Sequence, residues 1–570
     1  MVSYGFDDSW EWDQGYTQDC PTSATYYPPC NGSGTITGVT KHSMTLNGLR
    51  PGNSYDFGVR SRGFTNSLPD PSKATFDNVD CSGGCAFTTL AALTTGTYDY
   101  GFQPKGPQHI TAGYSVYIEL GTWPISGTRT GSADISVSGL PVGITMDSPD
   151  ADAGTCSASY VNATTYSYYD PGGCGNSYVK LTAASNTAVG SYTLKFTITT
   201  NGGSPTHTVS WPLTVDAATP LAQATPASYP PIPCLNSSSI QMDGSACTWN
   251  WATNMATYGS IWCVPGVGRN NGGPGDEQGA WYYDGERVYF QIHDYDQANN
   301  LTGNPAQWNT CATNWESVYG TYVTTNSGGI PGYRVFSDGP YMGYVRNGTT
   351  SDATNLNLLA TKSAYAGLDA SGADARLIRE IQYLITANRL DAKLGANTSA
   401  AATKAVDMTL GNVDQNVVSQ NADYVQPFML GLAADALIKY YEDGNTSDVR
   451  IPVAIRHIAD WLWANAWNKA SVSGYVFTDA FYYNNYYFKI GTPGQPFSSA
   501  SDMRNLNNLV CPLYAWLYQY TGDATYQDEG DQCWQAGVNF DPGSAIGWSG
   551  KNFSQNYRWS FDFVTWRGGH

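Results

Sequence analysis

One glycine-rich segment, residues 272–285, combines acidic and aromatic side chains in a pattern that suits acid–base chemistry on a sugar. It places Asp276 beside Glu277 and follows them with Trp281 and Tyr282. Adjacent carboxylates can donate or accept a proton, and aromatic faces can stack on sugar rings. We therefore expect Glu277 to act as a general acid and the two aromatic residues to contact substrate. An ordinary helix start, with acids near its N-terminus and aromatic residues in the core, would give the same pattern.

Two further segments repeat this combination. Residues 475–488 are dense in aromatic side chains, including Tyr482 and Tyr483, and carry one carboxylate, Asp479. Residues 333–344 surround Asp338 with tyrosines and a phenylalanine. Because glycosidases use two carboxylates, we expect Asp276, Asp338 or Asp479 to be the partner of Glu277, and Tyr482 and Tyr483 to bind substrate. Core packing or a self-association surface would also explain the aromatic excess.

A lyase would instead use a histidine or tyrosine to abstract a proton beside a uronate carboxylate. His293 is the histidine most open to this role and is also a candidate substrate-binding residue, although a histidine that caps a helix end is the plainer interpretation. The excess of acidic over basic residues in the helical part of the chain disfavours a polyanionic substrate, although a local basic patch could overrule it. The formal net charge of −19 disfavours nucleic acid and anionic lipid as partners.

A short acidic segment gives a weaker metal candidate. Asp147, Asp150 and Asp152 lie close together in sequence and could hold a structural Ca²⁺. The segment lacks the twelve-residue calcium-loop pattern and its closing glutamate, so a solvated acidic turn is the alternative. The hydrolase hypothesis itself requires no cofactor.

Composition points to an extracellular or cell-surface protein. Charged residues make up 13% of the chain, against ~25% in average soluble domains, while aromatic residues make up 14%. Polar surfaces without many charges suit a protein that faces glycans. No apolar run is long enough to span a membrane. The first residues lack the features of a secretion signal, and the cysteines favour a signal that was removed.

The cysteines support an oxidising compartment. There are 12 cysteines, and most have another cysteine nearby in the sequence. The sequence contains no CxxC pair of the kind that binds zinc. We expect six disulfides: Cys20–Cys30, Cys81–Cys85, Cys156–Cys174, Cys234–Cys247, Cys263–Cys311 and Cys511–Cys533. The last would join two neighbouring helices.

The periodicity of apolar residues divides the 570-residue chain. Residues 1–92 and 93–216 show the period-two alternation of half-buried strands, for example at Tyr55, Phe57 and Val59. Residues 217–233 are rich in proline and read as a semi-rigid linker. Residues 234–570 carry apolar stripes at helical spacing, such as those that begin at Leu377, Val425 and Leu506. The predicted architecture is two all-β sandwiches followed by an all-α domain.

Several segments resemble known modules. The stretch from Gly48 to Arg60 resembles a fibronectin type III hairpin, and residues 139–144 and 188–194 are similar to bacterial Ig-like repeats. Repeated helical hairpins behind such modules resemble the (α/α) toroids of glycoside hydrolases and polysaccharide lyases. The family 9 cellulases place an Ig-like domain before such a toroid, but their Asp-Ala-Gly-Asp motif is absent from this sequence, so no catalytic residue is carried over from them.

Together these patterns predict a secreted modular glycoside hydrolase that acts on a neutral or weakly charged polysaccharide. One alternative is a polysaccharide lyase that uses a histidine or tyrosine. The other is a non-catalytic protein that binds glycans at the cell surface or self-assembles there.

Overall fold

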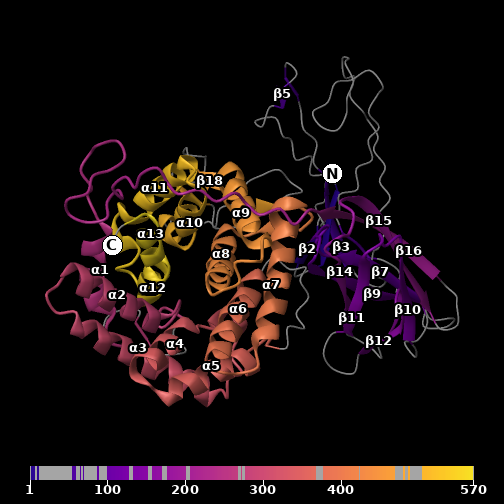
Figure 1. The fold of residues 1–570 in the computed structure, drawn as a ribbon, viewed down its shortest axis with the longest axis horizontal. Helices are drawn as coiled ribbons and strands as arrows, with labels where there is room; N and C mark the ends of the chain where they lie inside the picture. Colours follow the sequence, from indigo (N-terminus) through magenta and orange to yellow (C-terminus); the bar gives the residue numbers. More distant parts are fainter. Residues whose placement is uncertain are drawn as a thin grey trace.

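The computed structural model places β-strands in the first part of the chain and helices in the rest (Figure 1). It describes residues 2–6, 9–11, 54–59, 64–65, 68–69, 86–88, 99–126, 132–151, 157–169, 176–200, 206–266, 271–272, 277–366, 377–422, 424–468, 479–481, 486–487 and 503–568.

Six short strands are described before residue 99. A four-stranded sheet has the order β2-β1-β3-β6, with bounds Ser9–Glu11, Val2–Phe6, Ser54–Val59 and Ala86–Thr88. Strands β4 (Phe64–Thr65) and β5 (Leu68–Pro69) pair with each other. The alternating segment at Tyr55, Phe57 and Val59 is therefore a strand, as its period predicts.

The region from residue 99 to 216 contains two mostly antiparallel β-sheets. The six-stranded sheet runs β12 (Ser157–Asn162), β13 (Thr165–Tyr169), β10 (Ser132–Ser138), β15 (Gly190–Thr200), β16 (Thr206–Asp216) and β8 (His109–Thr111). The four-stranded sheet runs β11 (Ile144–Ala151), β14 (Asn176–Ala183), β9 (Ser115–Ser126) and β7 (Asp99–Lys105).

One apolar core joins these two sheets. Ile135 and Phe196 from the larger sheet are fully buried in the same cluster as Ile118 and Val179 from the smaller sheet. The Tyr166 hydroxyl lies 2.8 Å from the Ser177 hydroxyl and links strands of the two sheets. This part of the chain is therefore a β domain, built from the alternation visible in the sequence.

Thirteen α-helices are described after residue 250. They are α1 (Trp251–Trp262), α2 (Gly285–Asn299), α3 (Ala306–Thr325), α4 (Asp338–Asn347), α5 (Thr350–Lys362), α6 (Leu377–Lys393), α7 (Ser399–Val413), α8 (Pro427–Glu442), α9 (Arg450–Asn465), α10 (Cys511–Thr521), α11 (Ala524–Val538), α12 (Gly550–Tyr557) and α13 (Ser560–Trp566).

Shorter elements connect these helices. They are the helical turns Gly332–Arg334, Asp414–Val418, Met503–Leu509 and Pro542–Ser544, and the two-residue strands β17 (Tyr424–Val425), β18 (Trp467–Asn468), β19 (Ala480–Phe481) and β20 (Tyr486–Tyr487).

The helices follow a curved path that brings the end of the chain back to its first helices (Figure 1). Successive helices pack in pairs, such as α2 with α3 and α10 with α11. An inner series also forms, in which α2 contacts α4, α4 contacts α6, α6 contacts α8 and α8 contacts α10. Helix α12 packs against α1 and α2. Helix α2 therefore contacts helices from both the first and the last part of this region.

The apolar stripes were correct guides to helices α6, α8 and α10. Ile381, Leu384, Leu432, Leu513 and Leu517 are all buried on these helices. Residues 293–297 lie inside α2, where Asp294 and Gln297 are exposed and Asp296 is buried. None of the described helices is both long and apolar enough to cross a membrane.

Three of the six predicted disulfides are confirmed: Cys234–Cys247, Cys263–Cys311 and Cys511–Cys533. The last joins α10 to α11, as expected for neighbouring helices. The other three predicted pairs, Cys20–Cys30, Cys81–Cys85 and Cys156–Cys174, lie outside the described residues.

The proline-rich segment 217–233 packs along the helical region. The Ala224 amide donates to the Tyr520 carbonyl at 3.1 Å, and the Trp534 indole donates to the Pro233 carbonyl at 2.8 Å. Tyr229 meets the edge of Tyr518, with ring centroids 5.9 Å apart. Contacts with α10 and α11 thus add to the stiffness that proline gives this linker.

Candidate functional site

The amino ends of α2 and α4 are held together by Asp284. This residue has a positive φ of 69° and precedes α2, where its side chain accepts a hydrogen bond from the Arg287 amide. Its second oxygen accepts from the Gly339 amide at 3.1 Å. A side chain at position 339 would come within 2.4 Å of Asp284, so glycine is needed for this close approach. Asp284 therefore fixes where the next side chains of both helices project.

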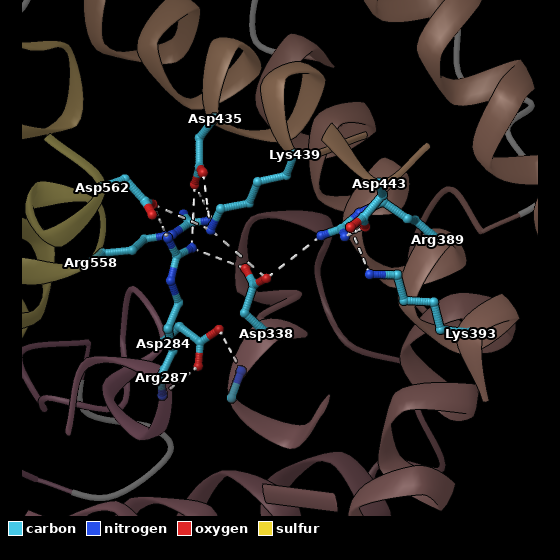
Figure 2. A network of polar contacts seen from close by, with 11 residues as sticks. Asp284, Arg287, Asp338, Arg389, Lys393, Asp435, Lys439, Asp443, Arg558 and Asp562 are labelled. Carbon is cyan, nitrogen blue, oxygen red and sulfur yellow. Dashed lines mark hydrogen bonds and ion pairs between the residues drawn. The ribbon is translucent and has the colours of Figure 1, made fainter. Parts of the chain in front are cut away.

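Arg287 lies at the centre of a group of buried charges, which we call the ionic network (Figure 2). Its guanidinium lies 3.0 Å from Asp338 on α4, 3.4 Å from Asp435 on α8 and 3.3 Å from Asp562 on α13. The Arg287 side chain is only 1% exposed. Three helices far apart in sequence thus meet on one cation.

Further cations complete the ionic network. Lys439 Nζ lies 3.3 Å from Asp435, 3.7 Å from Asp562 and 4.0 Å from Asp338. Arg558 and Arg389 pair with the same carboxylates, and Asp443 pairs with Arg389 and with Lys393 at the outer side of the group (Figure 2). We count ten residues as members of the network: Asp284, Arg287, Asp338, Arg389, Lys393, Asp435, Lys439, Asp443, Arg558 and Asp562.

The carboxylates of the network have opposite pKa shifts. Burial alone would raise the pKa of Asp338, but Lys439, Arg287, Arg389 and Arg558 hold it well below its usual range. The same balance lowers the pKa of Asp435. Desolvation raises the pKa of Asp562, because the attraction of Lys439 and Arg287 does not fully offset it. Paired carboxyl groups with separated pKa values are a feature of acid–base sites.

Exposure increases from one side of the network to the other. Arg287 and Asp435 are enclosed, whereas Asp338 is 12% and Asp562 29% exposed in their side chains. Lys393 and Asp443 are also partly exposed. Solvent therefore reaches both Asp338 and Asp562, the two carboxylates with opposite pKa shifts.

The sequence candidates for catalysis are not brought together as expected. Asp338 belongs to the ionic network, but Glu277 is 47% exposed and pairs with Arg334 instead. Asp479 is also exposed and precedes β19, where its backbone bonds to Asn468 and Asn507. Asp276 lies outside the described residues.

The aromatic residues predicted to stack on sugars occupy other surroundings. Trp281 is 1% exposed and packs against Tyr319 and Phe336. Tyr282 is buried against Phe336 in the same cluster. Since sugar stacking needs an open ring face, the interpretation of this segment as a helix start with core aromatic residues fits better. Tyr482 and Tyr483 lie outside the described residues.

The remaining candidates also lie apart from the network. His293 Nδ1 pairs with Asp294 at 2.9 Å on α2, where Asp294 also contacts Arg346. Asp147 and Asp150 lie on strand β11 and pair in register with Lys180 and Tyr178, so the acidic segment is a bulged strand as far as residue 151 and not a turn there. Asp152 lies outside the described residues.

The residues that sequence reasoning missed are Asp284, Arg287, Arg389, Asp435, Lys439, Arg558 and Asp562. Asp435 interrupts an otherwise apolar stretch of α8, and Asp562 stands between two phenylalanines. A lone charge within an apolar helical segment is a signal that could have identified both, because buried charges need partners. A separate group, Glu286, Glu316 and Asp352, contains carboxylates that could hold a metal ion.

Comparisons with known proteins give little guidance. No family model and no curated protein matches this sequence. A conjugative transposon lipoprotein from Bacteroides eggerthii shares 11% identity, covering 21% of this chain and 98% of its own, with a TM-score of 0.15. AvmM, which catalyzes macrocyclization in alchivemycin A biosynthesis, shares 8% identity over 21% of this chain and 88% of its own, with a TM-score of 0.14. Salmonella alpha-2-macroglobulin reacted with methylamine shares 11% identity over 90% of this chain and 29% of its own, with a TM-score of 0.22. Similarity this low supports no argument about fold or function.

Proposed function

We propose that this chain is a secreted glycoside hydrolase whose helical region closes into an (α/α) toroid and which acts on a neutral or weakly charged polysaccharide. The observation that carries the proposal is the position of Asp338 and Asp562 on either side of Lys439, with Nζ distances of 4.0 Å and 3.7 Å. Their nearest oxygens are therefore at most about 8 Å apart, which does not exceed the ~9.5 Å upper limit for glycosidase carboxyl pairs.

The two carboxyl groups have the properties that the reaction needs. Asp562 keeps its proton to higher pH because desolvation raises its pKa, so it suits the general acid that protonates the leaving oxygen. Asp338 stays ionised beside Lys439 and Arg287, so it suits the carboxylate that attacks the sugar or activates water. This assignment keeps Asp338 from the sequence prediction and replaces Glu277 with Asp562.

Secretion and the ring architecture have their own support. Three disulfides favour an oxidising compartment. The inner series of helices and the contact of α12 with α1 and α2 favour closure of the helical region.

The lyase alternative draws on the two cations that pair with Asp443. The Lys393 side chain is 37% exposed and that of Arg389 8% exposed, and Lys393 Nζ is 5.6 Å from the ring centre of Tyr341. A uronate carboxylate could pair with such cations while a tyrosine abstracts a proton. The network carries as many aspartates as cations, so a neutral substrate is favoured over a polyanion.

The test measures new reducing ends and absorbance near 235 nm on a panel of neutral and uronic polysaccharides. We expect reducing ends without the absorbance rise, and a loss of at least ~100-fold in Asp562→Asn, the range for general acids. Asp443→Asn is the matched control, because it removes a partly exposed aspartate of the same network that lies outside the proposed pair. Melting curves of both variants establish that they fold.

Three results would overturn the proposal. An absorbance rise would identify a lyase. Equal losses in Asp562→Asn and Asp443→Asn would show that the network acts only structurally. Glycan binding without cleavage by wild-type protein would favour the non-catalytic alternative.

A further inference from the structure

Three carboxylates from three helices converge beside the ionic network. Glu286 on α2, Glu316 on α3 and Asp352 on α5 each offer an oxygen, and these oxygens all lie within 4.8 Å of one another. We call this group the carboxylate cluster. It lies between the inner helix α2 and the outer helices α3 and α5. Helix α3 contacts both α2 and α5, and helix α4 also contacts both of them.

The cluster is buried and lacks hydrogen-bond partners. Glu286 is 3% exposed and Asp352 1% exposed. Three of their oxygens have no hydrogen-bond partner among the described residues: both carboxylate oxygens of Glu286 and Oδ2 of Asp352. Leaving a buried carboxylate without partners is costly, so these atoms require a ligand or a proton.

The surroundings provide negative charge and space. Burial raises the pKa of Glu286, and Asp352, Asp284 and Glu316 raise it further. Burial and Glu316 raise the pKa of Asp352 to about 7. On α4, Gly343 faces the cluster, because a side chain there would lie 2.5 Å from Asp352 Oδ2 and 2.6 Å from Glu286 Oε1. The neighbouring Arg287 pairs with the aspartates of the ionic network.

We propose that Glu286, Glu316 and Asp352 bind a hard divalent cation between α2, α3 and α5. Three carboxylates offer up to six oxygens, and Ca²⁺ takes about 6–8 oxygen ligands with flexible geometry. Mg²⁺ retains several waters and needs a near-octahedral site, so an enclosed cluster favours Ca²⁺. Glu316 is partly exposed whereas the other two are buried, so solvent reaches the cluster at Glu316.

Binding would fix the first turn of α2. Glu286 directly precedes Arg287, so a cation that ties Glu286 to α3 and α5 also sets the position from which Arg287 enters the ionic network. The site is thus a structural clamp between the two helical layers, and it stands whether or not the ionic network is catalytic.

The experiment uses full-length protein stripped of metal with EDTA and then desalted. Ca²⁺, Mg²⁺ and Mn²⁺ are titrated while the melting temperature is followed, and Tb³⁺ luminescence excited through nearby aromatic residues gives a second readout. We expect Ca²⁺ to raise the melting temperature by about 2–5 °C at 100-fold excess over its Kd.

Variants locate the ion. Glu286→Gln and Asp352→Asn should abolish both the thermal shift and the Tb³⁺ signal, whereas Asp528→Asn, an exposed aspartate on α11, should keep them. Gly343→Ala retains all three carboxylates but fills the space between them, so it should weaken Ca²⁺ binding at least ~10-fold, as disturbed supporting positions of metal sites do. If the buried variants do not fold, Glu316→Gln replaces them, since Glu316 is partly exposed.

Either of two results would overturn the proposal. One is a wild-type protein that shows no thermal shift and no Tb³⁺ signal at about 10 mM cation, well above the ~1 mM Kd of weak extracellular calcium sites. The other is a response that persists in the cluster variants, which would place the ion elsewhere in the chain.

Discussion

The ionic network and the carboxylate cluster each include one of two adjacent residues of α2, Arg287 and Glu286, yet the charges around these two residues differ. Arg287 projects to Asp338, Asp435 and Asp562, where cations and aspartates alternate. Glu286 projects to Glu316 and Asp352, where only carboxylates meet. Both sites are buried, so burial alone does not explain how they differ.

The difference shows that neighbouring cations can reverse the effect of burial on a carboxyl group, whereas neighbouring carboxylates add to it. Lys439 and the arginines lower the pKa of Asp338 in spite of its burial. Glu286 has carboxylates as neighbours, and its pKa is raised by burial and by their repulsion together. The network is therefore balanced from within the chain, while the cluster needs a proton or a cation from solution.

Removing the shared cation of the network should have the largest effect. Arg287→Met leaves buried aspartates with too few cations, and breaking a buried pair in this way costs about 3–5 kcal/mol of unfolding free energy. Urea unfolding followed by circular dichroism measures the loss. Arg346→Met is the control, since its partly exposed pair with Asp294 is worth less than ~1 kcal/mol. Equal losses would contradict the special role of the network.

The pH dependence of hydrolysis tests the roles of Asp562 and Asp338. Only protonated Asp562 can donate, and its pKa is raised, so kcat/KM should hold to a pH above the ordinary aspartate range and then fall. Asp338 has a lowered pKa and stays ionised across this interval. A pH–rate profile of wild type and Asp443→Asn should show the same falling limb. A profile with no such limb would exclude Asp562 as the acid.

Neutralising one member of the carboxylate cluster should have the opposite sign from a change in the network. In EDTA, Glu286→Gln removes a repelling carboxyl group and should stabilise the fold by about 0.5–2 kcal/mol, the range common for stabilising substitutions. With Ca²⁺ present, wild type should regain the advantage. Asp435→Asn, which loses its contacts to Arg287 and Lys439, should destabilise under both conditions. Denaturant midpoints with and without Ca²⁺ measure all three proteins.

The smallest effect is expected at Glu277. Its side chain is half exposed and pairs with Arg334, so Glu277→Gln should change stability by less than ~1 kcal/mol. Reducing-end release should remain near the wild-type rate, because Glu277 does not belong to the network that holds Asp338 and Asp562. A loss comparable to that of Asp562→Asn would restore the original sequence prediction.

Much of the fold could be predicted because local periodicity reports which face of an element is buried. Alternation at Leu194, Phe196 and Ile198 marks β15, and the spacing of Ile381, Leu384 and Ile385 marks α6. The pairing of Cys511 with Cys533 followed from their short separation. The bulged strand at Asp147 and Asp150 could not be seen, because its acidic residues carry no apolar alternation.

The candidate site was predictable only in part. Asp338 stood out because tyrosines and a glycine surround it in the sequence. Asp435 and Asp562 lie about 100 residues or more from it, on α8 and α13, and Arg287 lies on α2. Their proximity depends on how helices pack around a common centre, which no local pattern encodes.

The sequence by itself determined the order of a β region and a helical region, the disulfide pairs that the structure describes and the faces that are buried, since each follows from residues close together in the chain. Tertiary structure alone decided which charges meet. It turned Arg287 toward three aspartates and Glu286 toward two carboxylates, because successive helical residues project about 100° apart and so reach different neighbours. This difference in direction places Arg287 in the ionic network, where charges of both signs are present, and Glu286 in the carboxylate cluster, where we propose that a cation binds.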